Sequence, residues 1–403
     1  MIGTAAGRKL VAIALALIAV ATLIPGSSDA ANAVVRSWHP ALGDYGLADA
    51  IANVALFVPL GWTLTVAGVR PRRVVAVVLA TTITVEFLQY TIVAGRQASV
   101  WDVLANGVGG VIGIGLPHLS SRIMRSPPFA LRAAAVYGVA VVVGIAVGVL
   151  LQAVPQPRAV RWTNQDSHRP AYMPFAGTIN DVRMNGTSVP ADAWTEIPAG
   201  RVTIDVDLAS ALPSPRLAEI IQFWLRDGRG WAWVDQLGRD LRVHAVSRSD
   251  ALRLRGHSLW VRAAMPSAAG EPVALHLELR RFAHEVVVRS AQHEVRFSQR
   301  ISPGDGWQLF APFARPRERW GSLLQGLWMA LLLAPLGYAA AARSLRTVPI
   351  SGAGVAIGLM LLPIALGCAW LPVSGWCGGV GGILAGAWVG RAVLRGQAPD
   401  AIA

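Results

Sequence analysis

Eight long apolar runs dominate the sequence and limit what the chain can fold into. A helix rises about 1.5 Å per residue, so about 20 apolar residues cross the roughly 30 Å of hydrocarbon in a bilayer. With 54% hydrophobic and 15% charged residues, the chain of 403 residues is too apolar for an ordinary soluble protein. We therefore predict a polytopic α-helical membrane protein with about eight transmembrane helices, at residues 9–25, 49–68, 74–93, 101–118, 133–153, 322–342, 348–370 and 376–393.

The basic residues predict how these spans are oriented. The net charge is +13, and the basic residues gather at the ends of the apolar runs, around residues 8–9, 70–73, 122–132, 343–346 and 391–395. These clusters fall on alternate connections, and basic clusters next to spans mark the cytoplasmic side. We therefore expect a multi-pass protein of the cell (inner) membrane with both termini in the cytoplasm. Because the charge follows the spans, it does not indicate nucleic-acid binding.

Two further features leave alternatives open. Residues 1–33 have the form of a signal peptide, with Arg8 and Lys9 before an apolar run and a small-residue site after it, or they form a retained first span. Cys368 and Cys377 either form one disulfide or remain independent thiols, and the second reading is favoured because unpaired cysteine is often simply buried. Two cysteines provide neither a disulfide scaffold nor a zinc site, and no cofactor is predicted.

Three of the apolar runs each carry an acid with an amide about one helical turn away. The pairs are Asp49 with Asn53, Glu86 with Gln89, and Asp102 with Asn106. Residues three or four apart share one face of a helix. With the orientation given above, the rise per residue puts all six near the outer leaflet, with Glu86 about 12 Å from the outer end of its helix. Arg96 falls in the loop above them.

The order of these residues resembles the VanZ-like family of bacterial membrane proteins. The pattern reads D-x-x-x-N, then F-x-P-L-G from Phe57 to Gly61, a basic turn, E-x-x-Q, a loop with Arg96, and D-V-L-A-N-x-x-G. It covers roughly residues 10–118. The resemblance implies a retained first span and an association with glycopeptide (teicoplanin) resistance.

Structural roles compete with functional ones for most of these residues. Asp102 fits a capping box with Ser99, Asp49 fits an N-cap, and the three amides can bond between helices. Glu86 differs, because a charged carboxylate that deep costs about 2.5 kcal/mol or more unless it is paired, protonated or beside water. We therefore predict Glu86 as the functional centre and the best catalytic candidate. Arg96 is its expected partner, since a guanidinium grips a carboxylate or a phosphate in bidentate fashion.

Residues 155–320 differ in kind from the rest. Period-two alternation recurs in eight short runs, at residues 201–208, 220–227, 230–237, 240–246, 257–264, 273–280, 284–290 and 293–299. Such runs without intervening helices predict an antiparallel β-sandwich. Together with the stretches at 177–186 and 230–243, they resemble a concanavalin A-like (laminin G-type) jelly roll. The arginine pattern places this sandwich outside the cytoplasm.

The sandwich contains residues typical of ligand sites, and each has a plainer reading. Trp224, Trp231 and Trp233 offer stacking faces for sugar, but alternation puts Trp231 and Trp233 on one face, which is more typical of a core. Calcium ligands are another possibility for three acids, although no loop with suitably spaced oxygen ligands is present. These acids, which we expect to be solvated, are Asp181, Asp205 and Asp207.

The last three spans resemble an eroded second copy of the core. Pro335-Leu336-Gly337 repeats Pro59-Leu60-Gly61, and the G-V-G-G at 379–382 repeats the one at 107–110. The second copy lacks the polar residues of the first, and its last helix has glycines at 378, 382, 386 and 390, a spacing that permits close helix contact. The predicted domains are a VanZ-like core (1–118), a fifth span (119–154), the sandwich (155–320), three C-terminal spans (321–395) and a cytoplasmic tail (396–403).

Three functions remain open from the sequence. The first is a membrane protein that binds or protects an envelope lipid or cell-wall precursor at the outer leaflet, while the sandwich contacts wall carbohydrate or an envelope protein. The second is an intramembrane hydrolase or transferase acting on a lipid-linked phosphate or sugar, with Glu86 as general base. The third is a transporter, although the two copies run in the same direction and therefore do not form an inverted repeat.

Overall fold

Two compact units make up the protein. The computed structural model describes residues 4–23, 38–39, 45–93, 98–164, 172–198, 200–311 and 317–397. One unit comprises residues 1–141, 330–355 and 379–403, and the other comprises residues 142–329 and 356–378. The division falls within four long helices, so each unit is described by itself.

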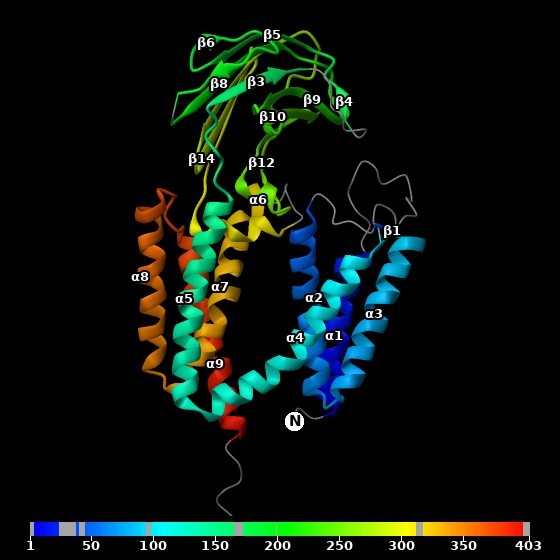
Figure 1. The fold of residues 1–403 in the computed structure, drawn as a ribbon, viewed down its shortest axis with the longest axis vertical. Helices are drawn as coiled ribbons and strands as arrows, with labels where there is room; N and C mark the ends of the chain where they lie inside the picture. Colours follow the sequence, from blue (N-terminus) through cyan, green and yellow to red (C-terminus); the bar gives the residue numbers. More distant parts are fainter. Residues whose placement is uncertain are drawn as a thin grey trace, which may run out of the picture. The chain divides into compact units, whose positions relative to one another are not determined.

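Each of the eight predicted spans coincides with a long helix (Figure 1). Among the described residues, seven helices are long and apolar enough to cross a membrane, and α1 is not one of these seven, so the eighth span stays a prediction. The helices are α1 (Thr4–Leu23), α2 (Gly46–Val66), α3 (Pro71–Thr91), α4 (Val100–Arg125), α5 (Pro127–Leu151), α7 (Arg317–Arg343), α8 (Thr347–Leu366) and α9 (Val373–Gln397).

Within the first unit, α1 to α4 pack around a small apolar core that includes Phe57, Leu60 and Val78, all 2% exposed or less. The contact between α2 and α4 is made by glycine. A Cβ atom at Gly109 would overlap the carbonyl oxygen of Val54, and one at Gly113 would overlap that of Val58. The common offset of 55 residues shows that α2 and α4 run parallel.

The C-terminal helices repeat this glycine contact. Gly337 of α7 meets the backbone of Ile383 in α9, as Gly61 of α2 meets the backbone of Gly110 in α4. The predicted close approach along α9 is confirmed, because added Cβ atoms at three of its glycines would overlap backbone carbonyls of α7. These glycines are Gly378, Gly382 and Gly386. The same kind of glycine contact thus joins both pairs of helices.

Two sheets form the all-β region of the second unit (Figure 1). One has the order β12-β11-β10-β9-β3-β7, with β4 also paired to β9, and the other has the order β15-β14-β13-β8-β5-β6. The strands are β3 (Ala159–Thr163), β4 (Met173–Pro174), β5 (Thr178–Met184), β6 (Thr187–Ser188), β7 (Thr195–Glu196), β8 (Val202–Ala209), β9 (Ser214–Trp224), β10 (Gly230–Gly238), β11 (Asp240–Ala245), β12 (His257–Val261), β13 (Pro272–Arg280), β14 (Ala283–Ser290) and β15 (Glu294–Arg300).

The eight predicted strands are all present, and the alternation has the predicted consequence. Along β8, Val202, Ile204 and Val206 are fully buried, whereas the residues between them are half-exposed. These side chains and those of β9, β10 and β11 form one core between the sheets. Five further strands, β3 to β7, were not among the eight predicted, and two short helical turns, α6 (Arg248–Ala251) and η1 (Pro303–Leu309), interrupt the all-β region.

The prediction for the tryptophans of β10 is wrong in one respect. Trp231 is 1% exposed and belongs to the core, but Trp233 is half-buried and stacks on His244, with ring centroids 4.1 Å apart. A β-bulge between Gly230 and Ala232 shifts the register, so that the two tryptophans do not share a face. Trp231 therefore has the predicted structural role, whereas Trp233 lies on the outer face of the sheet.

A buried polar network fixes the end of the sandwich to helices of the same unit. Asp305, 1% exposed, accepts hydrogen bonds from the Ser302 amide and from the side-chain amide of Gln325 in α7. The Gln325 carbonyl in turn accepts from the Ser374 hydroxyl in α9. The Ala369 amide also donates to the carbonyl of Ile301. The sandwich is thus joined to the helix ends by several hydrogen bonds as well as by the chain.

Both cysteines are free thiols, as the favoured reading predicts. Cys368 is buried after α8, whereas Cys377 is exposed on α9.

Candidate functional site

Glu86 lies at the contact between α3 and the start of α4. Its side chain is 2% exposed, and its Oε2 accepts a 2.8 Å hydrogen bond from the Ser99 amide. Ser99 is the N-cap of α4, and its hydroxyl accepts from the Trp101 amide. The same residue pairs with His39 in a parallel two-stranded sheet, β1 (Trp38–His39) with β2 (Ala98–Ser99). Glu86 therefore binds the loop that starts the next helix.

This bond alters the predicted role of Asp102. A capping box would direct the Ser99 amide to the Asp102 carboxylate, but Glu86 accepts that amide instead. Asp102 is half-buried in the first turn of α4, three residues after Ser99. Two acidic residues, Glu86 and Asp102, therefore lie near the start of α4.

A second polar contact lies one helical turn farther along the same interface. Asn106, 2% exposed, donates a 2.7 Å hydrogen bond from its side-chain amide to the hydroxyl of Thr82, which is fully buried. The Oδ1 atom of Asn106 is buried and accepts no hydrogen bond. A buried acceptor without a donor costs about 1 to 3 kcal/mol, so this atom requires an explanation.

Gln89 connects the site to α1. It is 6% exposed, and its side-chain amide donates a 3.0 Å hydrogen bond to the carbonyl oxygen of Thr22 near the end of α1. Hydrogen bonds between helices are the role predicted for such amides, each worth about 0.6 to 2 kcal/mol. The hydrogen bond to α1 therefore gives Gln89 a structural role.

The remaining predicted site residues make no described contact with Glu86 or Asn106. Asp49 is exposed in the first turn of α2, and Asn53 is half-buried one turn later. The offset of 55 residues between α2 and α4 puts these two at the heights of residues 104 and 108, close to those of Asp102 and Asn106. Arg96 lies outside the described residues. The structure thus brings Glu86, Asp102 and Asn106 to one interface, with Asn53 at a similar depth.

Sequence reasoning missed two partners in this site. Thr82 and Ser99 supply the hydroxyl and the amide that bind Asn106 and Glu86. The signal for Thr82 was present, since it lies four residues before Glu86 on the same helix face. The role of the Ser99 amide could not be predicted, because every residue except proline has a backbone N–H and the residue type does not show which one binds a side chain.

The acids of the sandwich are bound by basic side chains. Asp181 and Asp207 both pair with Arg183, at 3.1 and 2.7 Å, and Asp205 pairs with His276 at 2.7 Å. Across the part of the chain that the structure describes, no group of three or more His, Cys, Asp or Glu side chains is arranged to hold a metal ion.

The outer face of the sandwich holds further polar contacts. Asp235 is fully buried and forms an ion pair with Arg242, while Asp250 lies 3.4 Å from His244. Burial alone would raise the pKa of Asp250, but hydrogen bonds from His244 and from Ser247 lower it. These contacts tie β10 and β11 to α6.

The comparisons with known proteins identify one part of the chain. Residues 11–121 match the family model described as VanZ/LLP1. No curated protein and no solved structure is detectably similar to the chain. The matched segment contains α2, α3, most of α1 and α4, and every predicted site residue.

Proposed function

Because residues 11–121 form a VanZ-like membrane region, we propose that the protein binds the polar head of an envelope lipid or lipid-linked cell-wall precursor. The site is the polar interface of α3 and α4, at the end where α3 finishes. The observation that carries the proposal is the pair of buried acceptors, Glu86 and the Oδ1 atom of Asn106.

The chemistry of the site favours a ligand that donates hydrogen bonds. Ionised Glu86 and Asp102 and the Asn106 Oδ1 atom all accept hydrogen bonds. A hydroxyl or ammonium group of a lipid head would satisfy the unpaired carbonyl and offset the negative charge. Arg96, which precedes β2 in the sequence, would hold a phosphate on the same ligand, and Asp49 and Asn53 would flank it.

The arginine pattern supports the orientation in which this site faces outward. In that arrangement eight spans cross the cell membrane, both termini are cytoplasmic, and residues 155–320 are extracytoplasmic. The sandwich, which resembles a concanavalin A-like domain, would then contact wall carbohydrate or an envelope protein. Binding of a wall precursor would account for a link to glycopeptide resistance.

A hydrolase or transferase with Glu86 as general base is the alternative. Against it, one oxygen of Glu86 already accepts the Ser99 amide, so that only its second oxygen remains to take a proton from a substrate. The site residues therefore suit binding better than proton abstraction.

Native mass spectrometry of the protein purified from its membrane tests this function. We expect a lipid to be retained by the wild type and its occupancy to fall about tenfold in Glu86→Gln, which removes the charge but keeps the size. The matched control is Glu196→Gln, the same substitution at an exposed carboxylate of β7, which should leave the lipid occupancy unchanged. Equal lipid occupancy in wild type and Glu86→Gln would refute binding through Glu86.

A further inference from the structure

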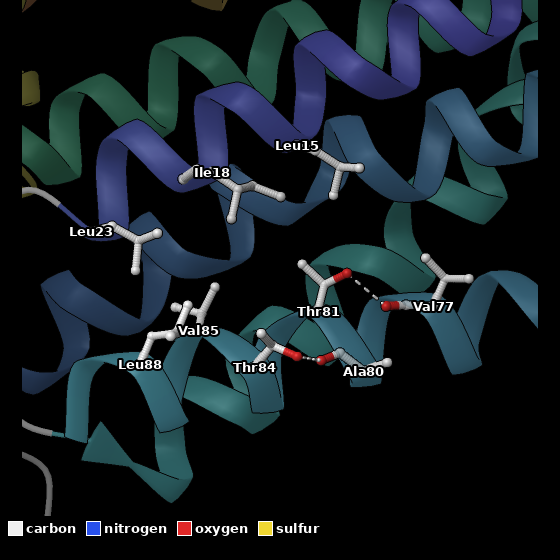
Figure 2. A pocket seen from close by; sticks show the side chains of 10 residues that line it. Leu15, Ile18, Leu23, Val77, Ala80, Thr81, Thr84, Val85 and Leu88 are labelled. Carbon is white, nitrogen blue, oxygen red and sulfur yellow. Dashed lines mark hydrogen bonds between the residues drawn. The ribbon is translucent and has the colours of Figure 1, made fainter. Parts of the chain in front are cut away.

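A groove of about 400 Å³ lies between α1 and α3 (Figure 2). Ile18 and Val85, 2% and 6% exposed, lie deepest among its lining residues. Its volume is in the range of sites that hold small molecules. Its walls are formed by Leu15, Ala19 and Leu23 of α1 and by Val77, Ala80, Thr81, Thr84 and Leu88 of α3.

The lining offers almost nothing to a polar ligand. Its two hydroxyl groups donate to carbonyls of their own helix, Thr81 to Val77 and Thr84 to Ala80, each at 2.8 Å (Figure 2). A hydroxyl bonded in this way has no proton left to donate into the groove. The other eight lining residues are Ala, Val, Leu or Ile. The chemistry of the groove therefore selects hydrocarbon.

The length and place of the groove fit a lipid chain. From Val77 to Leu88 the helix rises about 16 Å, which is close to half of the roughly 30 Å hydrocarbon thickness. The groove is continuous with the membrane-facing surface of α3, where Ile83 and Phe87 are 57% and 59% exposed. Its length thus matches the depth of one leaflet, and it runs from the first half of α3 toward the end that carries Glu86.

The groove also adjoins the polar site. Leu23 and Leu88 lie at its end, and their neighbours Thr22 and Gln89 are hydrogen bonded to each other. Val85 forms part of the groove, and the next residue is Glu86. A chain lying in the groove would therefore have its polar head beside the acceptors of α3 and α4.

We propose that this groove binds one acyl or prenyl chain of the lipid whose head is held near Glu86, an inference that rests on the proposed function. A chain in the groove and a head at the acceptors would make the site specific for a lipid rather than for a free sugar or phosphate. The groove would also hold the lipid in one leaflet.

Photo-crosslinking of the full-length protein tests the chain site. The probe is phosphatidylglycerol with a diazirine midway along one acyl chain, and adducts are mapped by mass spectrometry. We expect adducts to concentrate on residues 15–23 and 77–88. Ala80→Phe, which fills the groove, should reduce these adducts about tenfold. The matched control is Ala76→Phe, on the same helix but outside the groove, which should leave them unchanged.

The outcomes separate this proposal from the head-group site. Adducts spread evenly over all membrane-facing helices, or unchanged in Ala80→Phe, would overturn the chain site. If the Ala80→Phe protein fails to reach the membrane, the same crosslinking experiment is carried out on Ala19→Phe, which fills the groove from the α1 side. Groove adducts that are lost in Ala80→Phe, with lipid occupancy unaffected in Glu86→Gln, would support a chain site and refute the head-group function.

Discussion

Gly113→Leu is expected to reduce the amount of folded protein in the membrane by about tenfold or more. Even a Cβ atom at Gly113 would lie 2.6 Å from the Trp62 amide nitrogen and would overlap the carbonyl oxygen of Val58. Both are backbone atoms of α2, so no side-chain rotation relieves the clash, and the two helices must separate. Their separation would also move the start of α4, which Glu86 binds through Ser99.

Gly115→Leu is the matched control for this prediction. Gly115 lies two residues farther along the same helix, and a Cβ atom there meets nothing within 4 Å. The control therefore adds the same side chain to α4 without a clash. Membrane abundance and the thermal midpoint of the purified protein give the comparison. Similar values for the two variants would show that the glycine contact does not hold α2 and α4 together.

Glu86→Gln is expected to abolish the glycopeptide tolerance that we propose for the protein, while leaving its membrane abundance within about twofold of wild type. Glutamine is nearly the same size, and its side-chain carbonyl can still accept the Ser99 amide. The substitution removes the negative charge that we assign to ligand binding. The measurement is teicoplanin susceptibility of cells that express each variant, together with quantified membrane fractions.

Glu86→Ala distinguishes folding from function. It leaves the Ser99 amide without its acceptor, at a cost of about 1 to 3 kcal/mol, so it should lose abundance as well as tolerance. Arg96→Ala should resemble Glu86→Gln, with normal abundance and no tolerance. Full tolerance in both Glu86→Gln and Arg96→Ala would remove these residues from the function.

Much of the site was predictable because membrane helices make polar residues conspicuous. Glu86 and Asn106 stood out as polar residues in apolar runs, and both are buried at one interface. Their partners were harder to predict, because helix spacing says which residues share a face but not which helix that face meets. The sequence therefore gives no sign of the Ser99 amide as a partner, and Glu86 accepts the hydrogen bond that a capping box would give to Asp102.

The sandwich shows a similar limit. Period-two alternation located the eight strands correctly because one face of each strand packs into or against a common core. The same rule failed at Trp233, where the bulge beside Trp231 breaks the alternation, and bulges have no firm sequence signature. Strands of two residues, such as β4 and β6, are too short to show any period.

The most direct test of the account is the side of the membrane on which its parts lie, because the site is proposed to face outward together with the sandwich. Single cysteines replace Leu212 and Leu345, which are 65% and 57% exposed, in a protein carrying Cys368→Ala and Cys377→Ala. A membrane-impermeant maleimide should label Leu212→Cys in intact cells and Leu345→Cys only after permeabilisation. The reverse pattern would place the sandwich and the Glu86 end of α3 in the cytoplasm and contradict the account.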